Sequence, residues 1–343
     1  MRTKVLSLLC ACLSLLPTGL QSSDSGYHLT KTVKLGGEGF WDYLNVDSDA
    51  RRLYISRGTH VMVLDADSLE VLGDLPNTQG VHGIALASEL GRGFTSNGRA
   101  NTVTIFDLKT LKVLGEVKTG QNPDAIIYDP ASRRVFTFNG RSGDSTAIDA
   151  ASGSVAGTIA LGGRPEFAAA DGKGHVYANL EDKSMVVAID SQKLTVVSRW
   201  PLAPGEEPSG MAMDRDHRRL FSGCHNKMMV VMDADSGKVV ATPPIGQGVD
   251  ANAFDPGTGL AFSSNGDGTL TVVHQESPDK YSVVDNIQTQ RGARTMALDL
   301  KTHNVYLVTA EFGPPPAPTA DQPRPRPSIV PGSFVVLVVS RQR

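Results

Sequence analysis

The segment PDAIIYDPASRRVFTFNGRSGDSTAIDAASGSVAGTIALGG, residues 123–163, is a unit that the rest of this chain repeats. It holds four short apolar runs, AIIY, VFTF, TAI and VAGTIAL, and each run is bounded by Asp, Pro, Gly, Asn or Ser. Those bounding residues favour turns, and short apolar runs between turns are typical of β-strands. The segment therefore predicts a four-stranded antiparallel meander.

An aromatic residue opens the second run of every copy of this unit. Neighbouring copies lie 40 to 44 residues apart, although only 6% of the chain is aromatic. The seven positions are Tyr54, Phe94, Phe136, Tyr177, Phe221, Phe262 and Tyr306. A period of about 40–45 residues with four strands per unit is the signature of a β-propeller. We expect this aromatic column to fill the gaps between neighbouring blades, because one small sheet cannot bury both of its faces alone.

The two ends of the chain predict how the ring closes. The seventh unit supplies two strands, then the proline-rich residues 313–332, then the strand SFVVLVV at 333–339, but no fourth strand. A spare strand, YHLTKTVKL at 27–35, precedes the first unit. Pairing the two removes open sheet edges. The fold class is therefore expected to be all-β: one seven-bladed propeller over residues 27–343, with four antiparallel strands per blade. The N-terminal strand closes the last blade, and 313–332 forms a loop inserted in blade seven.

The N-terminus has the pattern of a secretory signal peptide. Arg2 and Lys4 precede the apolar residues 5–16, and small residues suit cleavage near Ser22. We expect residues 1–22 to be removed and the protein to be exported, to the periplasm or outside the cell. A lipoprotein anchor at Cys12 is a less favoured alternative, because the apolar run continues past that cysteine.

Composition narrows the function classes. The formal net charge is −3, and removal of two basic residues with the signal peptide leaves about −5, which gives no electrostatic reason to bind nucleic acid. The body has no apolar run of about 18 residues, so no transmembrane anchor is expected in the mature chain. Cys224 is the only cysteine after residue 12, so no internal disulfide is expected.

Three blade cores resemble the YVTN-type β-propeller repeat family. They are residues 94–98 (FTSNG), 136–140 (FTFNG) and 262–266 (FSSNG), each followed by an apolar strand. The whole mature chain is similar to the exported, YncE-like members of that family. The resemblance implies the fold but no single activity, since its relatives include lactonase-like enzymes, domains beside redox centres, surface-layer proteins and binding proteins.

One polar residue stands just before the innermost strand of each unit. Innermost strands line the central channel of a propeller, so these residues are expected to ring one channel mouth. They are Asp42, His82, Asp124, Glu166, Ser209, Asp250 and Arg294. Such a funnel suits a bound divalent cation, the one candidate cofactor, or a polar ligand held by the arginine.

The loop after the second strand of each unit is expected to face the same mouth. Its polar residues are Arg57, Asn97, Asn139, Glu181, His225, Asn265 and Glu311. His82 and His225 with Asp124, Glu166 or Glu311 could form a mixed nitrogen and oxygen metal site.

Three interpretations of the mouth residues stay open. They line a solvated channel, they bind an unknown small ligand or protein partner, or they serve a lactonase-like hydrolase whose catalytic residues remain unassigned. We favour an exported binding module and assign it no metal, with His82, Asp124 and Glu166 as the candidate ligands if one binds.

Other patterns indicate local structure. The aspartates that end the third strand are expected to accept backbone N–H groups in tight turns; they are Asp65, Asp107, Asp149, Asp190 and Asp233. Cys224 and His225 are sequence neighbours in a predicted strand and therefore point to opposite faces, which disfavours a nucleophile–base pair. Residues 265–269 (NGDGT) lack the downstream glutamate of a calcium loop and predict a hairpin turn.

Overall fold

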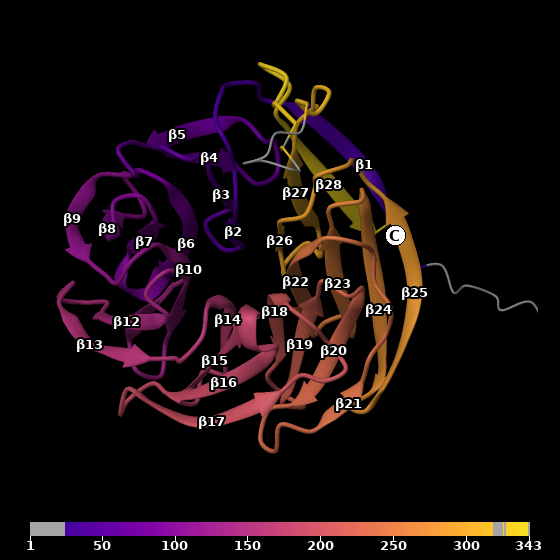
Figure 1. The fold of residues 1–343 in the computed structure, drawn as a ribbon. Coiled ribbons are helices and arrows are strands. Elements are labelled where there is room, and N and C mark those ends of the chain that lie inside the picture. The colour runs from indigo at the N-terminus through magenta and orange to yellow at the C-terminus, as the bar shows by residue number, and fades with distance from the viewer. Residues whose placement is uncertain (1–24, 318–324, 326, 342–343) are drawn as a thin grey trace, which may run out of the picture.

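The computed structural model describes residues 25–317, 325 and 327–341, and within them the strands are arranged in a ring around a central axis (Figure 1). The expected signal peptide at 1–22, with Cys12, lies outside the described residues, as do 318–324 and 326 of the proline-rich segment. No helix in the described part is long and apolar enough to cross a membrane.

The described strands form seven four-stranded antiparallel sheets, the blades of the ring. From the channel outward, blades one to four comprise β2 (Leu44–Asp47), β3 (Arg52–Ser56), β4 (Val61–Asp65) and β5 (Val71–Leu75); β6 (Val81–Ala87), β7 (Arg92–Asn97), β8 (Thr102–Asp107) and β9 (Val113–Lys118); β10 (Pro123–Asp129), β11 (Arg134–Asn139), β12 (Asp144–Asp149) and β13 (Val155–Ala160); and β14 (Pro165–Ala170), β15 (His175–Leu180), β16 (Met185–Asp190) and β17 (Thr195–Pro201). Blades five to seven comprise β18 (Pro208–Asp214), β19 (Arg219–Cys224), β20 (Met228–Asp233) and β21 (Val239–Ala241); β22 (Val249–Asp255), β23 (Leu260–Asn265), β24 (Thr269–Ser277) and β25 (Lys280–Gln288); and β26 (Met296–Leu298), β27 (Val305–Thr309), β28 (Val335–Arg341) and β1 (Tyr27–Lys34). Two short 3-10 turns complete the assigned elements: η1 (Ser88–Leu90) and η2 (Glu181–Lys183).

The aromatic column lies where the sequence predicts it, between the blades. Each of its seven side chains is at most 1% exposed. Each also belongs to a different cluster of buried side chains, and each cluster is built chiefly from two adjacent blades. Phe94, for example, packs with Val135 and Ile148 of the next blade. The blades therefore bury their faces against each other, as apolar burial requires.

The aspartates at the ends of the third strands confirm the predicted turns. Asp65 Oδ1 accepts the backbone N–H groups of Asp67 and Ser68 at 3.0 and 2.8 Å. Asp149 accepts the N–H of Ser152 at 2.7 Å in the same way. These hydrogen bonds hold each turn between the third and fourth strands in place.

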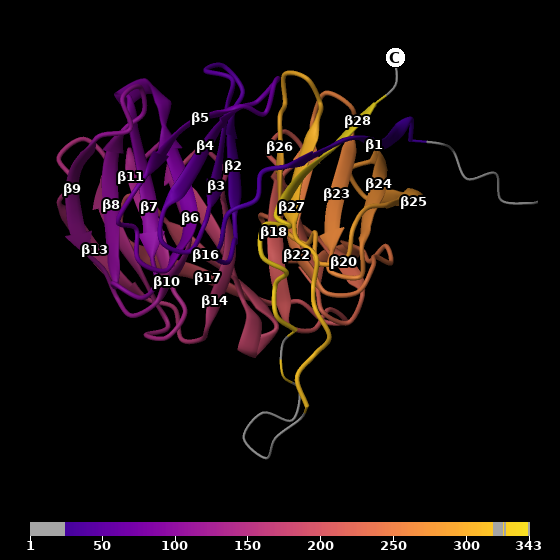
Figure 2. The same cartoon turned by 90° about the horizontal axis from the view of Figure 1, so that it is seen from above.

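The ring is closed by the strand from the N-terminus, as predicted. β1 pairs with β28 antiparallel, from Tyr27 opposite Arg341 to Lys34 opposite Val335. The two strands run side by side in both ribbon views (Figures 1 and 2). The proline-rich segment leaves the ring between β27 and β28, and its described parts project from one face (Figure 2). Phe312 and Ile329 form a β-bridge at its base.

Tyr27 joins the closing strand to blade six, and its removal should therefore loosen the ring. Its side chain is 3% exposed, and its ring meets Phe262 edge-on at a centroid distance of 5.2 Å. Tyr27→Ala is expected to lower the free energy of unfolding by about 3–5 kcal/mol, the usual cost of deleting a buried aromatic ring. Chemical denaturation would measure it.

Tyr27→Phe and Thr32→Ala are the matched controls. The Tyr27 hydroxyl has no hydrogen-bond partner among the described residues, and Thr32 is exposed on the same strand, so each change is expected to cost less than about 1 kcal/mol. An alanine at 27 that unfolds like the wild type would contradict this account of the closure.

Candidate ligand-binding site at the channel mouth

All seven residues of the predicted polar column line one cavity of about 900 Å³. Five of them are the second residue of their inner strand and do not precede it, whereas Asp42 and Arg294 come just before β2 and β26. All seven come from different blades, and the ring brings the starts of their inner strands together at the same end of the channel (Figure 1). The set is Asp42, His82, Asp124, Glu166, Ser209, Asp250 and Arg294. A cavity of this size accommodates a small organic ligand. We call it the mouth cavity.

Carboxyl groups from blades one, three, four and six converge in the mouth cavity. Burial, and then the charges of Asp124 and Glu181, raise the pKa of Glu166 to about 10. Burial also raises the pKa of Asp124 and of Asp250, although Arg294 opposes the second shift by pairing with Asp250 at 3.0 Å. Carboxyl groups this close cannot all be ionised without a compensating cation, so Glu166 keeps its proton at neutral pH.

His82 links two of the acids. Its Nδ1 lies 2.6 Å from Asp42 Oδ2 and 3.6 Å from Asp124 Oδ1. Burial alone would lower the pKa of His82, but the hydrogen bond with Asp42 and the charges of Asp124 and Asp42 outweigh it and raise the pKa to about 9. The ring is therefore positively charged at neutral pH.

The same three residues are also the group in the described chain best placed to hold a metal ion. One ligand atom from each of Asp42, His82 and Asp124 lies within 4.8 Å of the others. The metal would have to displace the proton of the imidazole, because a ligating nitrogen must be deprotonated. Glu166 and His225, also considered as ligands, line the cavity but stand outside this group.

Tyr43 lines the mouth cavity and is held by a second aromatic side chain. Tyr43, next to Asp42, packs edge-on against Phe167 with 4.8 Å between ring centroids. Phe167 contacts core clusters on three sides of the channel. Burial and the surrounding carboxylates, Asp124 and Glu166 first among them, raise the pKa of Tyr43 well above its usual value. An aromatic contact thus holds Tyr43 beside the carboxyl groups of the mouth.

The residues after the second strands do not all face the mouth, which corrects the prediction for that column. Glu181, His225 and Arg57 line the cavity, whereas Glu311 is exposed on its loop and is not among the lining residues. Three asparagines are fully buried and donate from Nδ2 to threonine hydroxyls of their own blades; they are Asn97, Asn139 and Asn265. The last residue of these strands points into the blade, whereas Glu181 and His225, each one residue past the end of its strand, line the cavity.

Two rim arginines escaped the sequence prediction. Arg99 and Arg141 are exposed, and both line the mouth cavity. Each follows the buried asparagine by two residues in a repeated Asn-Gly-Arg triplet, at 97–99 and 139–141. The repeated triplet is the sequence pattern from which these two arginines could have been predicted. Trp41 and Tyr43 also line the cavity, but the sequence did not predict this, because aromatic residues beside the polar column are expected to lie in the core.

Cys224 and His225 are separated as the strand alternation predicts. Cys224 is fully buried, and burial raises the pKa of its thiol to about 12. His225 is exposed and lies 3.4 Å from Glu207. A buried, protonated thiol is a poor nucleophile, so this pair gives no catalytic site.

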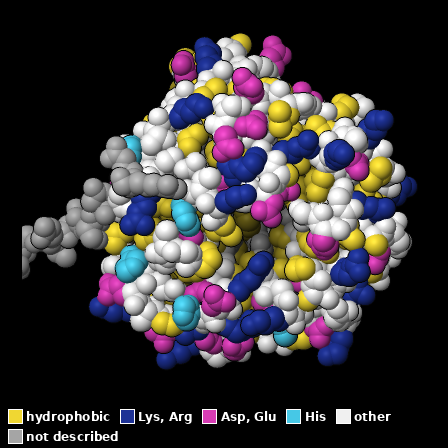
Figure 3. Space-filling model, turned by 180° about the vertical axis from the view of Figure 1, so that it is seen from behind, with side chains coloured by type: hydrophobic (Ala, Val, Ile, Leu, Met, Phe, Trp, Pro, Cys, Tyr) yellow, Lys and Arg dark blue, Asp and Glu magenta, His cyan; other side chains and the backbone are white. Residues whose placement is uncertain are grey.

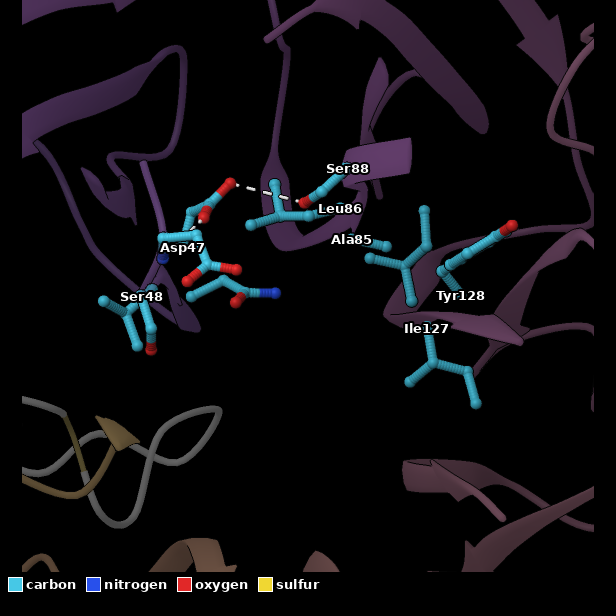
Figure 4. Close-up of a pocket in the computed structure, with 11 residues that line it drawn as sticks. Asp47, Ser48, Ala85, Leu86, Ser88, Ile127 and Tyr128 are labelled. Atoms are coloured by element: carbon cyan, nitrogen blue, oxygen red, sulfur yellow. Dashed lines mark hydrogen bonds between the residues drawn. The ribbon is translucent and has the colours of Figure 1, made fainter. Parts of the chain in front are cut away.

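The other face of the ring carries a second, smaller cavity of about 350 Å³ at the far ends of β2, β6 and β10. Figure 4 shows Asp47 and Ser88 joined by a hydrogen bond on one side, with Ile127 and Tyr128 opposite. Seen from behind, this face is hollowed at its centre, and acidic and basic side chains are interspersed over it (Figure 3). No continuous basic surface appears there.

Comparisons with known proteins bear on the fold alone. No family model matches the chain, and no curated protein sequence matches it. Among solved structures, a chain from "Kuenenia stuttgartiensis Hydrazine Synthase" is similar with a TM-score of 0.67 and 15% identity, over 80% of this chain and 95% of that one. A chain from "Crystal Structure of Mitotic Checkpoint Complex" gives 0.74 and 14%, over 99% of both chains, and "Structure of U3-55K" gives 0.73 and 11%, over 89% and 98%. Likeness at such low identity supports the seven-bladed propeller and carries no activity with it.

Proposed function

We propose that this chain is an exported β-propeller module, periplasmic or extracellular, that binds a small ligand or a protein partner in the mouth cavity. The observation that carries the proposal is the convergence of one polar side chain from every blade on a single cavity. Its YVTN-type repeat cores and its N-terminal signal pattern support a place among the exported YncE-like propellers.

The converging carboxyl groups of the cavity favour a ligand with a positively charged group. Asp42, Asp124, Glu166 and Asp250 meet there, and the opposing cations from the same column are His82 and Arg294. A divalent cation or an organic ammonium group would relieve the repulsion between the acids. Asp42, His82 and Asp124 are the residues that would hold a metal.

A lactonase-like hydrolase is the second candidate, because a carboxylate that orients an imidazole is a common arrangement for acid–base catalysis. Asp42 and His82 have that geometry at 2.6 Å. The raised pKa of His82, about 9, argues against it as a base at neutral pH, since the ring already holds its second proton. Binding is therefore the favoured function. A nucleic-acid ligand is disfavoured by the net charge of −3.

Removal of the carboxylates should abolish binding of a cationic ligand. Calorimetric titration with divalent cations, sugars and short peptides would test the intact protein and the triple variant Asp124→Asn, Glu166→Gln, Asp250→Asn. The variant is expected to bind at least about a hundredfold more weakly, since buried charge pairs are worth roughly 2–5 kcal/mol. The control neutralises three exposed acids elsewhere: Glu70→Gln, Glu116→Gln and Asp216→Asn. Equal binding by both triple variants would exclude the mouth cavity.

Binding of a cation should also release a proton. Glu166, with a raised pKa of about 10, is protonated at pH 7 in the free protein, and a neighbouring cation favours its ionised form. Affinity is therefore expected to rise with pH between 6 and 9, by up to about tenfold per unit if one proton leaves. Titrations at pH 7 in buffers of different ionisation enthalpy would count the protons. Glu166→Gln should lose that release; an unchanged count would contradict the assignment.

A further inference from the structure

Arg57 is a buried cation without a carboxylate partner among the described residues. Its side chain is the largest of those that are fully buried, with the residue 1% exposed. Nη2 donates to the carbonyl of Glu38 at 2.9 Å, but Nε and Nη1 are buried with no hydrogen-bond partner. The nearest influential acid, Asp74, acts on Arg57 by charge alone and lies 3.5 Å from His60.

Other half-buried arginines of the chain are paired differently. Arg51 contacts Asp67 and Asp299, each at 2.6 Å. Arg218 contacts Asp171 at 3.0 Å and Asp235 at 2.8 Å. Buried charges usually have such partners, because an unpaired one loses its hydration without compensation. Arg57 is more buried than either arginine, and its charge is unneutralised.

The surroundings of Arg57 resemble one wall of a binding site. The guanidinium carbon lies 3.6 Å above the centre of the Phe334 ring, and Trp41 packs on the same phenylalanine at 5.4 Å. Arg57 and Trp41 both line the mouth cavity, together with Gly39 and the exposed Phe40. The Arg57 guanidinium thus stacks on an aromatic ring beside the cavity, and its Nε and Nη1 donors remain available to a ligand.

The segment that covers Arg57 is a strap of residues 36–40 between β1 and β2. Three of its residues are glycines with φ of 69°, 77° and 97°, conformations that side chains with a Cβ rarely adopt: Gly36, Gly37 and Gly39. A Cβ at position 37 would lie 3.4 Å from Nη2 of Arg57. The strap therefore lies close against the guanidinium. The Glu38 carbonyl accepts a hydrogen bond that the guanidinium could otherwise donate to a ligand.

We propose that Arg57 is an oxyanion subsite of the mouth cavity, where a carboxylate or phosphate group of the ligand accepts hydrogen bonds from the guanidinium once the strap is displaced. This rests on the proposed binding function and adds to it a chemical class. The ligand carries an oxyanion near Trp41 and a cationic group among the carboxyl groups that converge in the mouth cavity. Guanidinium is well suited to either oxyanion because of its planar set of donors.

A structural anchor is the competing explanation, and it predicts a different response. Stacking on Phe334 and the hydrogen bond to Glu38 would hold the strap whether or not an oxyanion is present. In that case neither acetate nor phosphate would affect the protein beyond their ionic strength. If Arg57 is an oxyanion subsite, the response of the protein to acetate or phosphate must saturate as the anion concentration rises.

Trp41 provides a local reporter. The chain has two tryptophans, and Trp200→Phe leaves Trp41 as the single one. The emission of that protein would be titrated with sodium acetate and, separately, with inorganic phosphate, each against sodium chloride at equal ionic strength. We expect a saturable change with at least one oxyanion, none with chloride, and a matching rise in melting temperature. The more effective anion distinguishes carboxylate from phosphate. No saturable change with either would overturn the proposal.

Substitutions assign the response to Arg57. Arg57→Met is expected to abolish it, and Arg57→Lys, a second variant that keeps the charge, to weaken it at least tenfold. Arg133→Gln, an exposed arginine on the other face, should respond like the parent. Equal saturation in the Arg57 variants would overturn the subsite. Cation titrations of the same parent protein are a separate measurement. A protein that binds cations but shows no oxyanion response would refute only the Arg57 subsite. A protein that shows the oxyanion response but binds no cation would refute only the proposed cation binding.

Discussion

The burial of one aromatic ring between each pair of blades is the interaction on which this structure depends. A four-stranded sheet has two apolar faces, and neither can be left in water. Each blade solves this by packing on the next, and Tyr54 to Phe106, or Phe221 to Phe254, shows the contact between neighbours. The arrangement is stable only if the last blade meets the first. The ring therefore needs β1, which lies far from β28 in sequence and completes its sheet.

Closure of the ring also creates the candidate site. Seven inner strands start at the same end of the channel, so the residues at their starts are forced together regardless of their charges. This explains why Asp124, Glu166 and Asp250 have raised pKa values, and why His82 has gained a proton between two aspartates. The shifted pKa values in the cavity thus result from the meeting of seven inner strands at one end of the channel.

The mouth cavity offers groups of both charges. Carboxyl groups from four blades converge in it, Arg57 stacks on Phe334 beside Trp41, and the rim carries Arg99 and Arg141. A ligand with charges of both signs is therefore the natural occupant of such a cavity. The buried asparagines next to the rim take no part, since each is bound to threonines of its own blade and serves the blade's internal order.

The repeat period, the turn residues and the two spare strands were enough to predict seven blades and their closure, because local strand and turn preferences recur at a fixed spacing. The polar column before each inner strand was predictable for the same reason. Tertiary structure alone decided which later residues reach the mouth: Glu181 and His225 do, whereas Asn97 turns inward and Glu311 stays outside. It also decided that Arg57 is buried without a carboxylate. Burial and pairing depend on contacts between segments distant in sequence, and no local pattern records them.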